Sequence, residues 1–433
     1  MKSIWWEGVD LSRFPTLKQD INTDVLIIGG GMAGVLTAYL LSQQGVDCVL
    51  VEKERIGGGV TGNTTAKVTA QHGLIYNQIA QDYGLDAAKV YLQANLQALE
   101  RYAALADTIP CDWERQDNFV YAVNDRQKLE DEYRTLDKLG YPATLCDTVP
   151  LPLKTVGAVC FPRHAQFHQL KFLAGIAQGL RIYENTFVRE MVGNWAITDS
   201  GTVRANTVVV VTHFPFLNKH GSYFLKLYQH RSYVLALENV PSIKGMYVDK
   251  CQTGLSFRGY GDHLLLGGGG HRTGKNGGNW SELRAFAAEH YPRARETHHW
   301  AAQDCMSLDG IPYIGQYSKR THELYTAGGF NKWGMTGAML SAMLLCDRIT
   351  KKDNPWASVF DPSRSMLKPQ LLVNGLESTV GLLTPFSKRC PHLGCALKWN
   401  PAEHSWDCPC HGSRFSKDGK LLDNPANGDL KRV

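Results

Sequence analysis

The sequence has 433 residues, of which 43% are hydrophobic and 20% charged, a balance typical of a globular protein of two or three domains. The 46 basic side chains exceed the 41 acidic ones by only five, and no run of Lys or Arg exceeds two residues, so nothing indicates nucleic-acid binding. No apolar stretch approaches the roughly 18 residues of a membrane span, and the first residues lack a signal-peptide core, so we expect a cytoplasmic protein without a transmembrane segment.

The first predicted unit is a strand, a glycine-rich turn and a helix. Residues 24–28 form an apolar run typical of a buried parallel strand, and residues 29–34 (GGGMAG) fit the pattern G-x-G-x-x-G. A helix is expected over residues 32–44, and a second strand over residues 47–51 ends at Glu52, where such folds hold a ribose hydroxyl. This order predicts a dinucleotide site, with its pyrophosphate at the helix N-terminus. The expected cofactor-binding residues here are Gly29, Gly31, Met32, Ala33, Gly34, Glu52 and Lys53.

Four later segments indicate which dinucleotide is bound. Small residues and hydroxyls fill residues 57–66, residues 203–212 form an apolar strand, residues 309–315 read DGIPYIG, and residues 328–337 read GGFNKWGMTG. In this order the segments resemble the D-amino-acid oxidase and sarcosine (glycine) oxidase family of flavoproteins, over roughly residues 20–350. The resemblance implies FAD, reduced directly by a substrate. It adds these cofactor-binding residues: Thr64, Thr65, Val188, Gly329, Gly334, Met335 and Thr336.

Three residues are candidates for contact with the substrate. His271 follows a run of four glycines, where similar enzymes place a pocket histidine, although a lone histidine is also common as a structural residue. Arg231 and Tyr233 lie in a predicted strand and are candidates for binding a substrate carboxylate or amine, although strand arginines often only pair on a surface. His72 is a candidate flavin neighbour. Lys332 and Trp333 lie in the loop expected near the flavin ring.

Four cysteines gather near the C-terminus, where a metal site is more plausible than a disulfide framework. Cys390 and His392 form C-x-H, and Cys408 and His411 form C-x-x-H. Zinc is the generic interpretation of such ligands. The specific one is a Rieske 2Fe–2S centre, in which two cysteines hold one iron and two histidines the other.

The flanking letters, CPHLGC at 390–395 and CPCHGS at 408–413, resemble the cluster loops of Rieske proteins from respiratory cytochrome bc complexes. The resemblance implies a disulfide between Cys395 and Cys410, and a hydrogen bond from Ser413 to a bridging sulfur. Phe415 stands where high-potential members have a tyrosine, so a lower potential is expected. Residues 424–428 resemble the loop that covers the cluster.

We therefore predict an α/β fold, a Rossmann-like FAD-binding domain with an inserted α+β substrate domain, followed by a small all-β Rieske domain. The expected ranges are 20–80, 150–214 and 320–355 for the FAD-binding domain, 81–149 and 215–319 for the substrate domain, 356–368 for a linker and 369–433 for the Rieske domain. The substrate domain is expected to contain helices over 87–106 and 126–139 and strands over 233–237 and 263–266. Before the first cluster loop, only residues 370–373 and 378–383 are available as Rieske strands.

The resemblance implies oxidation of a small amine or amino-acid-like substrate, with single electrons leaving through the cluster to an external protein. A dehydrogenase is expected rather than an oxidase, because residues 267–270 are all glycine and supply no cation for oxygen activation beside His271; Lys67, Lys275 and Lys332 remain candidates for that cation. Two alternatives stay open: an electron-transfer or redox-sensing protein without an organic substrate, and an oxygen-using amine oxidase with an accessory cluster.

Overall fold

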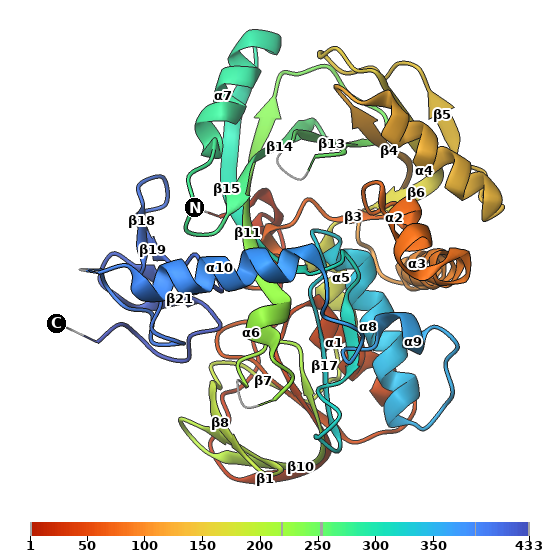
Figure 1. The fold of residues 1–433 in the computed structure, drawn as a ribbon. Coiled ribbons are helices and arrows are strands. Elements are labelled where there is room, and N and C mark those ends of the chain that lie inside the picture. The colour runs from red at the N-terminus through yellow and green to blue at the C-terminus, as the bar shows by residue number, and fades with distance from the viewer. Residues whose placement is uncertain (1, 218–219, 252–253, 386, 432–433) are drawn as a thin grey trace.

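The computed structural model describes residues 2–217, 220–251, 254–385 and 387–431, which form three β-sheets with helices around them (Figure 1). The first sheet belongs to the nucleotide-binding part, the second to the inserted part and the third to the C-terminal part. Among the helices of these residues, none combines the length and the apolar character needed to cross a bilayer.

The first sheet has eight strands, and its centre is parallel. Strands β2 (Cys48–Val51), β1 (Ile21–Ile28), β10 (Thr202–Val210) and β17 (Leu324–Gly328) run in this order, with β7 (Ile182–Tyr183) at one edge and β16 (Tyr313–Gln316) at the other. The hairpin β8 (Val188–Val192) and β9 (Trp195–Thr198) attaches to β10. Helices α1 (Met32–Ser42) and α8 (Gly334–Ile349) pack against each other beside this sheet. The predicted strands at 24–28, 47–51 and 203–212 and the helix at 32–44 are confirmed.

The second sheet has nine strands. They run in the order β15 (Arg295–Ser307), β11 (Leu227–Glu238), β14 (His263–Arg272), β13 (Ser256–Tyr260), β12 (Met246–Asp249), β4 (Glu114–Ala122), β6 (Gly157–Gln166) and β3 (Lys67–Val68), and β5 (Thr144–Cys146) pairs with β6. Helices α2 (Ile75–Tyr83), α3 (Leu85–Ala106), α4 (Arg126–Lys138), α5 (Gln169–Ile176) and α7 (Asn279–His290) accompany the two larger sheets. The helices predicted over 87–106 and 126–139 and the strands predicted over 233–237 and 263–266 are therefore present.

Three predicted ranges cross the boundary between these sheets. Strands β3 and β6, which the ranges 20–80 and 150–214 assign to the FAD-binding domain, pair in the second sheet, because β6 is antiparallel to β4 from Gly157 to Gln166. Conversely, β16 falls within the range 215–319, but it pairs with β17 in the first sheet. The local sequence of an apolar strand does not specify which sheet the strand joins, so the sheets of β3, β6 and β16 could not be predicted from it.

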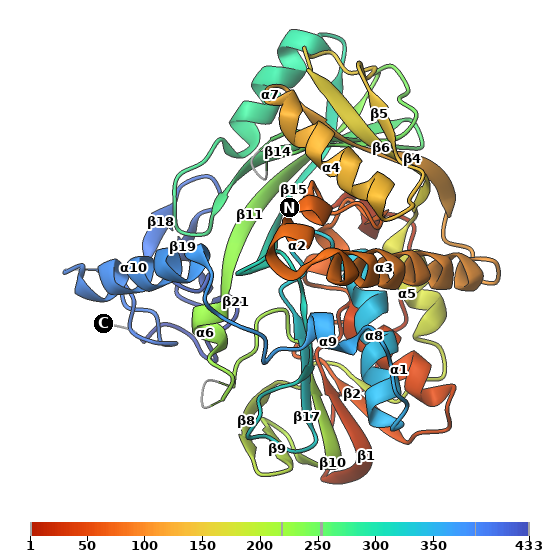
Figure 2. The same cartoon turned by 45° about the vertical axis from the view of Figure 1, so that its right-hand side comes forward.

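The third sheet is small and antiparallel, with β18 (Lys398–Asn400), β19 (Ser405–Asp407), β20 (Arg414–Ser416) and β21 (Leu421–Asp423) in this order. Helix α10 (Pro369–Leu383) lies along it at the outer edge of the molecule, beside α6 (Tyr223–Lys226) (Figure 2). The strands expected at 370–373 and 378–383 are therefore wrong. Pro369 suits the first turn of a helix, and the apolar residues that follow recur at helical spacing.

The segment expected to be a linker is anchored to the first sheet. It contains α9 (Ala357–Phe360), and Arg364 pairs through two nitrogens with Asp309 of the DGIPYIG segment, at 2.8 Å for each contact. Both side chains are buried, so the segment fixes the path of the chain from α8 to α10.

Candidate nucleotide cleft, substrate cavity and metal centre

The glycine turn after β1 needs glycine for two steric reasons. Gly29 has φ +117°, and a Cβ there would lie 2.6 Å from the Val211 carbonyl oxygen. A Cβ on Gly34 would overlap the Gly29 carbonyl oxygen. Gly31 differs, because its φ is −74° and its nearest side-chain neighbour would be the Thr61 hydroxyl at 3.5 Å. The chain itself therefore leaves space above Gly31, at the N-terminus of α1.

Glu52 closes the same turn from the end of β2. Its carboxylate accepts hydrogen bonds from the Gly30 amide at 2.7 Å and from the Glu54 amide at 2.9 Å. Burial raises the pKa of this carboxyl above its usual value, although both amide donors oppose the shift. Glu52 is thereby fixed in the lining of the cleft, at the position where such folds hold a ribose hydroxyl.

A cavity of about 610 Å³ extends from this turn toward the third sheet. Most of the predicted cofactor-binding residues line it, namely Gly29, Gly31, Met32, Ala33, Glu52, Lys53, Thr64, Val188, Gly334 and Met335. The other four, among them Thr65, do not line it. Gly34 packs behind the turn, Gly329 faces Leu227, and the Thr336 hydroxyl donates to the Thr69 carbonyl at 2.8 Å.

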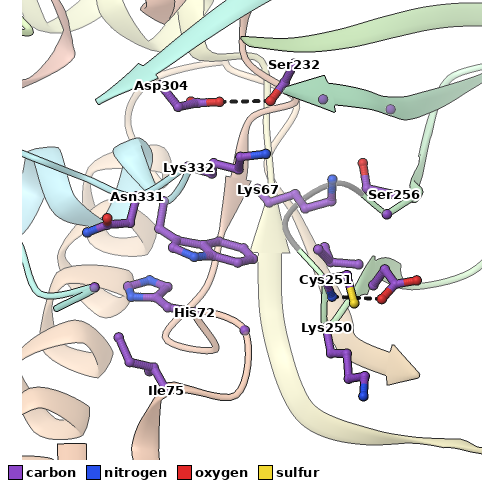
Figure 3. A pocket seen from close by; sticks show the side chains of 18 of the residues that line it. Lys67, His72, Ile75, Ser232, Lys250, Cys251, Ser256, Asp304, Asn331 and Lys332 are labelled. Carbon is purple, nitrogen blue, oxygen red and sulfur yellow. Dashed lines mark hydrogen bonds between the residues drawn. The ribbon is translucent and has the colours of Figure 1, made fainter. Parts of the chain in front are cut away.

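A second cavity, of about 570 Å³, adjoins the first and shares with it Asn63, Thr64, Ala302, Asp304, Lys332 and Met335. Thr65 lines this second cavity. Lys67, from β3, and Lys332, from the loop before α8, both line this cavity (Figure 3). The Ser232 hydroxyl donates to Asp304 at 3.1 Å (Figure 3). Burial lowers the pKa of Lys67 to about 7, with a smaller contribution from Arg258, and burial also lowers the pKa of Lys332.

His72, labelled in Figure 3, lines the second cavity. Trp333 lines it as well. Their rings stack with centroids 5.2 Å apart. His72 Nε2 lies 2.8 Å from the Thr69 carbonyl and Nδ1 lies 2.6 Å from the Tyr91 hydroxyl, so Nε2 donates and Nδ1 accepts. Burial lowers the pKa of His72 to about 3, which keeps the ring neutral.

Two of the three predicted substrate residues contact a protein carboxylate, and the third contacts one of these two. Arg231 forms a buried ion pair with Glu403, and the Tyr233 hydroxyl donates to Glu403 at 3.0 Å. Tyr233 also contacts His271 Nε2 at 3.0 Å. Tyr233 lines the second cavity and Arg231 the first, whereas His271 lines neither. In this structure the Arg231 guanidinium is paired with Glu403, from the loop between β18 and β19, and a contact of Arg231 with a substrate carboxylate stays a prediction.

The two C-terminal loops have the same backbone hydrogen bonds. In the first, the Cys390 amide donates to the Cys395 carbonyl and the Gly394 amide to the Cys390 carbonyl, both at 2.9 Å. In the second, Cys408 pairs with Ser413 and Gly412 with Cys408 in the same pattern. Gly394 and Gly412 both have positive φ, near +80°. Two matching loops therefore face each other with their cysteines and histidines inward.

The side chains of these loops separate into a sulfur half and a nitrogen half. The Cys390 thiol hydrogen-bonds with Cys408 and with the Ser413 hydroxyl. The rings of His392 and His411 lie edge to face with centroids 4.9 Å apart. Both ring nitrogens of His411 are buried without a hydrogen bond of normal geometry among the described residues. Paired thiols beside paired imidazoles are the donor set of a Rieske centre, so the residues fit a 2Fe–2S cluster.

Cys395 and Cys410 lie behind the predicted ligands. Their sulfurs and that of Cys408 lie within 4.8 Å of one another. Both are free thiols here, so the implied disulfide stays a prediction.

The cluster loops are held by strands of the second sheet. Gln229 Nε2 donates to the His411 carbonyl at 2.9 Å and to the Asn424 carbonyl at 3.0 Å, and Gln303 Nε2 donates to the Gly412 carbonyl at 2.8 Å. Asn424 in turn donates to the carbonyls of Thr212 and Phe214, after β10. The metal centre is therefore docked on both the inserted part and the nucleotide-binding part of the chain.

Aromatic rings cover the predicted histidine ligands. Phe214 lies with its ring centroid 6.4 Å from that of His392 and 6.3 Å from that of His411. Phe224 approaches His411 at 6.3 Å from the other direction. The histidine side of the centre thus faces the body of the protein.

Comparison with known proteins agrees with this geometry. The family model for FAD-dependent oxidoreductases matches residues 24–348, and the model for the Rieske [2Fe–2S] domain matches residues 366–433. The chain belongs to the FAD-dependent oxidoreductase family. It also carries a C-terminal Rieske domain, so the prediction of FAD and a Rieske 2Fe–2S cluster as cofactors is confirmed, along with the fold class. The donor set and the domain match favour iron over the zinc alternative.

Relatives extend over both parts of the chain. A putative Rieske 2Fe–2S iron–sulfur protein, YhfW of Bacillus subtilis, is 33% identical over 495 aligned positions, covering 100% of this chain and 97% of that protein. Gamma-glutamylputrescine oxidoreductase of Escherichia coli is 24% identical over 77% of this chain and 85% of its own length. An iron–sulfur subunit of the cytochrome b6-f complex of Trichormus variabilis is 46% identical over 55 residues, 12% of this chain and 31% of that subunit.

Solved structures share the fold of the larger part. Glycine oxidase from Geobacillus kaustophilus superimposes with a TM-score of 0.66 at 21% identity, covering 80% of this chain and 99% of that one. L-Proline dehydrogenase from P. horikoshii superimposes with a TM-score of 0.68 at 17% identity, covering 81% and 98%. These similarities establish a common fold for the nucleotide-binding and inserted parts.

Several residues that join the two cofactor sites were not found from the sequence. Each of them lies in a segment without a motif and acts through a contact with a residue more than 100 positions away in the sequence. They are Gln229, Gln303, Phe214 and Glu403. Spacing along the chain carries no signal for such contacts. Only the alternation of β15 gives a hint, since it places Gln303 and Asp304 on opposite faces of one strand.

Proposed function

We propose that this chain oxidises a small amine or amino acid at its C–N bond and passes the electrons to its own Rieske cluster. When bound, FAD accepts two electrons from such a bond, and the 2Fe–2S cluster accepts one at a time. Glycine oxidase and L-proline dehydrogenase among the structures, and gamma-glutamylputrescine oxidoreductase among the relatives, are named for compounds of this class. They support the substrate class and not one compound.

The main support for the proposal is that strand β15 lines both cavities and also contacts a cluster loop. Asp304 lines both cavities, and its neighbour Gln303 donates to the Gly412 carbonyl, next to the predicted ligand His411. Two consecutive residues thereby connect the substrate cavity with a cluster loop. Phe214, just after β10 of the nucleotide-binding sheet, also lies beside the rings of His392 and His411.

The second cavity has the chemistry to hold a small zwitterion. Lys67 and Lys332 offer cations to a carboxylate, and Asp304 offers an anion to an ammonium group. The neutral His72 and the indole of Trp333 provide an uncharged wall. A cavity with this lining supports an enzyme with its own organic substrate over a purely electron-transferring module.

We assign the role of electron acceptor to the cluster rather than to oxygen. The glycines before His271 supply no cation, but Lys67 and Lys332 reach the cavity from elsewhere, so the preference for a dehydrogenase depends on the cluster as the exit. The external partner that then receives the electrons is a redox protein or carrier of single electrons.

The test is an anaerobic screen of amines and amino acids, followed through bleaching of the flavin absorbance, and then stopped-flow mixing with oxygen. The holoprotein is compared with Cys408→Ser, which removes a predicted cluster ligand, and with Cys146→Ser, a remote cysteine in β5. We expect bleaching with one substrate class, rapid reduction of the cluster in wild type and Cys146→Ser, and slow flavin reoxidation by oxygen in Cys408→Ser.

Two outcomes would contradict the proposal. Fast reoxidation of the flavin by oxygen in Cys408→Ser would identify an oxidase with an accessory cluster. Absence of bleaching with every amine, together with reduction of the flavin by a redox protein, would identify an electron-transfer module.

A further inference from the structure

Helix α10 is amphipathic, but it exposes its apolar side to solvent and turns its polar side toward the protein, the reverse of an ordinary surface helix. Its outward side chains are apolar: Leu372 is 78% exposed, Leu376 66% and Leu383 76%. Its inward side is polar, since Asn374 is 2% exposed, accepts from Arg272 Nη1 at 3.0 Å and donates to the Leu225 carbonyl at 3.1 Å. A surface helix usually buries its apolar stripe against its own protein. The exposed stripe of α10 therefore indicates that something other than this chain covers it.

The exposed apolar residues form one continuous face. At about 100° per residue, Leu372, Val373, Leu376, Val380 and Leu383 fall within an arc of about 100°. We call these five residues the α10 apolar face; all are between 47% and 78% exposed. Next to it, Leu382 approaches Gly394 of the first cluster loop, where Leu393 is 40% exposed. The face therefore lies beside the loop that carries His392.

The charges around this face are mainly basic, because Glu377, the acidic residue of α10 beside the face, is paired with Lys275 at 2.8 Å. Residues 378–402 contain no Asp or Glu, and they contain Lys388, Arg389 and Lys398, all exposed. The Arg389 guanidinium donates to the Leu382 carbonyl at 3.1 Å and to the Thr384 carbonyl at 2.7 Å, so its charge lies at the C-terminal end of the helix. A surface of leucines bordered by cations is complementary to an anionic surface with an apolar interior.

This charge distribution argues against a second copy of the chain as the occupant. In a two-fold contact between α10 apolar faces, the basic end at Lys388 and Arg389 would meet either the same end of the other copy or Lys368, just before the helix. Like charges would meet in the first arrangement, and in the second the basic end would meet Lys368 already paired with Asp82 at 3.0 Å, so neither arrangement offers it an unpaired anion.

We propose that the α10 apolar face docks the protein on an anionic lipid bilayer, with the helix lying in the plane of the interface. Fifteen residues are too few to cross a bilayer but suit a helix that inserts its apolar side among the headgroups. Docking in this orientation brings the first cluster loop, through its exposed Leu393, to the membrane surface. This inference concerns where the protein works and does not depend on the substrate proposed above.

The test is flotation of the full-length holoprotein with lipid vesicles. We expect binding to phosphatidylcholine vesicles that contain about one quarter phosphatidylglycerol, and weaker binding to pure phosphatidylcholine. The variant Leu372→Ser/Leu376→Ser/Leu383→Ser should lose on the order of a hundredfold or more in partitioning, because three large apolar contacts are removed. Lys388→Glu/Lys398→Glu should lose about tenfold or more on the anionic vesicles only.

The matched control is Leu85→Ser/Val123→Ser/Val192→Ser, which changes three exposed apolar residues in other parts of the molecule. It should bind as wild type does. FAD and iron contents confirm that each variant is folded. Equal flotation of wild type and the α10 triple variant would overturn the proposal, and so would absence of binding to anionic vesicles. A dimer in sedimentation equilibrium that the α10 triple variant abolishes, without vesicle binding, would assign the face to a second copy.

Discussion

Arg231 of β11 and Glu403 of the C-terminal domain form a buried two-point ion pair, with Nε 3.0 Å from Oε1 and Nη2 in contact with Oε2. Arg414 adds a further contact to Glu403 at 2.8 Å, and Tyr233 donates to the same carboxylate. Burial opposes ionisation of Glu403, but Arg231 and Arg414 hold the pKa of its carboxyl below the usual value. The pair therefore fixes the Rieske domain on the second sheet by charge as well as by packing.

Replacement of Glu403 by Gln should loosen this contact, because it leaves the buried Arg231 guanidinium without its anion, whereas Arg414 keeps its pairs with Asp407 and Asp423. We expect a loss of about 3 kcal/mol in the free energy of unfolding of the C-terminal domain and slower reduction of the cluster by the flavin. Denaturant unfolding followed by visible circular dichroism of the cluster measures the first effect, and stopped-flow spectroscopy measures the second.

The matched control is Glu100→Gln, which breaks the exposed pair between Glu100 and Arg115. It should change stability by about 0.5 kcal/mol or less. Since the pKa of Glu403 is lowered in the folded state, the stabilisation is present above the ordinary carboxyl pKa and is lost as the pH falls through the folded-state value. The difference between wild type and Glu403→Gln should therefore shrink on acidification; a constant difference would contradict the ionic interpretation.

Gly31 offers a test of the nucleotide cleft in which folding and binding are separated. An alanine Cβ there would meet only the Thr61 hydroxyl at 3.5 Å, and the φ of −74° suits alanine. Gly31→Ala should fold with unchanged stability and yet bind FAD at least tenfold more weakly, because the Cβ occupies the space of the pyrophosphate. Fluorescence titration of the apoprotein with FAD measures this. Gly375→Ala, at an open position of α10, is the control and should bind FAD normally.

Local motifs predicted the cofactor sites well, because each is built from residues close together in sequence. Each of these sites is a loop of six consecutive residues whose backbone geometry follows directly from its sequence. The loops are the turn from Gly29 to Gly34 and the two cluster loops. The roles of Arg231 and Tyr233 could not be predicted in this way. Their partner Glu403 lies on another domain, and no local pattern indicates which domain surface a strand arginine will face.

Helix α10 shows a different limit of sequence reasoning. The resemblance to Rieske domains predicts strands for its apolar residues, whereas Pro369 and the spacing of Leu372, Leu376 and Leu383 favour a helix. Expectation from a family thus overrode periodicity. The exposure of these side chains depends on the tertiary contact of Asn374 with Arg272, which no sequence pattern contains.

Lys67 predicts a pH dependence of anion binding in the second cavity. Burial, together with Arg258, lowers its pKa to about 7, so the free protein loses this cation as the pH rises through about 7. The affinity for a simple carboxylate such as acetate, followed through the flavin spectrum, should fall by up to about tenfold per pH unit above that value. Lys67→Met should bind acetate weakly at every pH, and Lys67→Arg should bind it with little pH dependence. An unchanged profile in Lys67→Met would assign the titration to another group.

The reduction potential of the cluster should respond to Ser413 and Phe415. Ser413 hydrogen-bonds with the Cys390 thiol and accepts from the Ala426 amide at 2.9 Å, and a donor to a ligand sulfur stabilises the more negative reduced cluster. Ser413→Ala should lower the midpoint potential by about 40 mV, equivalent to about 1 kcal/mol. Phe415→Tyr, which restores the hydroxyl of high-potential Rieske proteins, should raise it. Potentiometric titration followed by EPR measures both, and Phe214→Tyr reports whether any added hydroxyl nearby has the same effect.

The last prediction concerns the two cysteines that do not belong to the ligand set. Cys395 and Cys410 sit one on each cluster loop, and a Cβ on Gly381 of α10 would lie 2.6 Å from the Cys410 sulfur and 3.6 Å from the Cys395 sulfur. We expect an oxidised pair in the mature holoprotein, because the family resemblance places a disulfide here and burial beside α10 restricts access of reductants. Peptide mapping of the unreduced protein should find the two cysteines linked.

The variant Cys395→Ala/Cys410→Ala should retain the cluster but lose about 3 kcal/mol in stability, the value for a loop of about 15 residues. The control Cys48→Ala/Cys346→Ala removes two buried thiols outside the domain and should leave the unfolding of the cluster domain unchanged. Free thiols at Cys395 and Cys410 in protein purified without reductant would show that the family inference ends at the four ligands, and that Gly381 is required only for close packing of α10 against the loops.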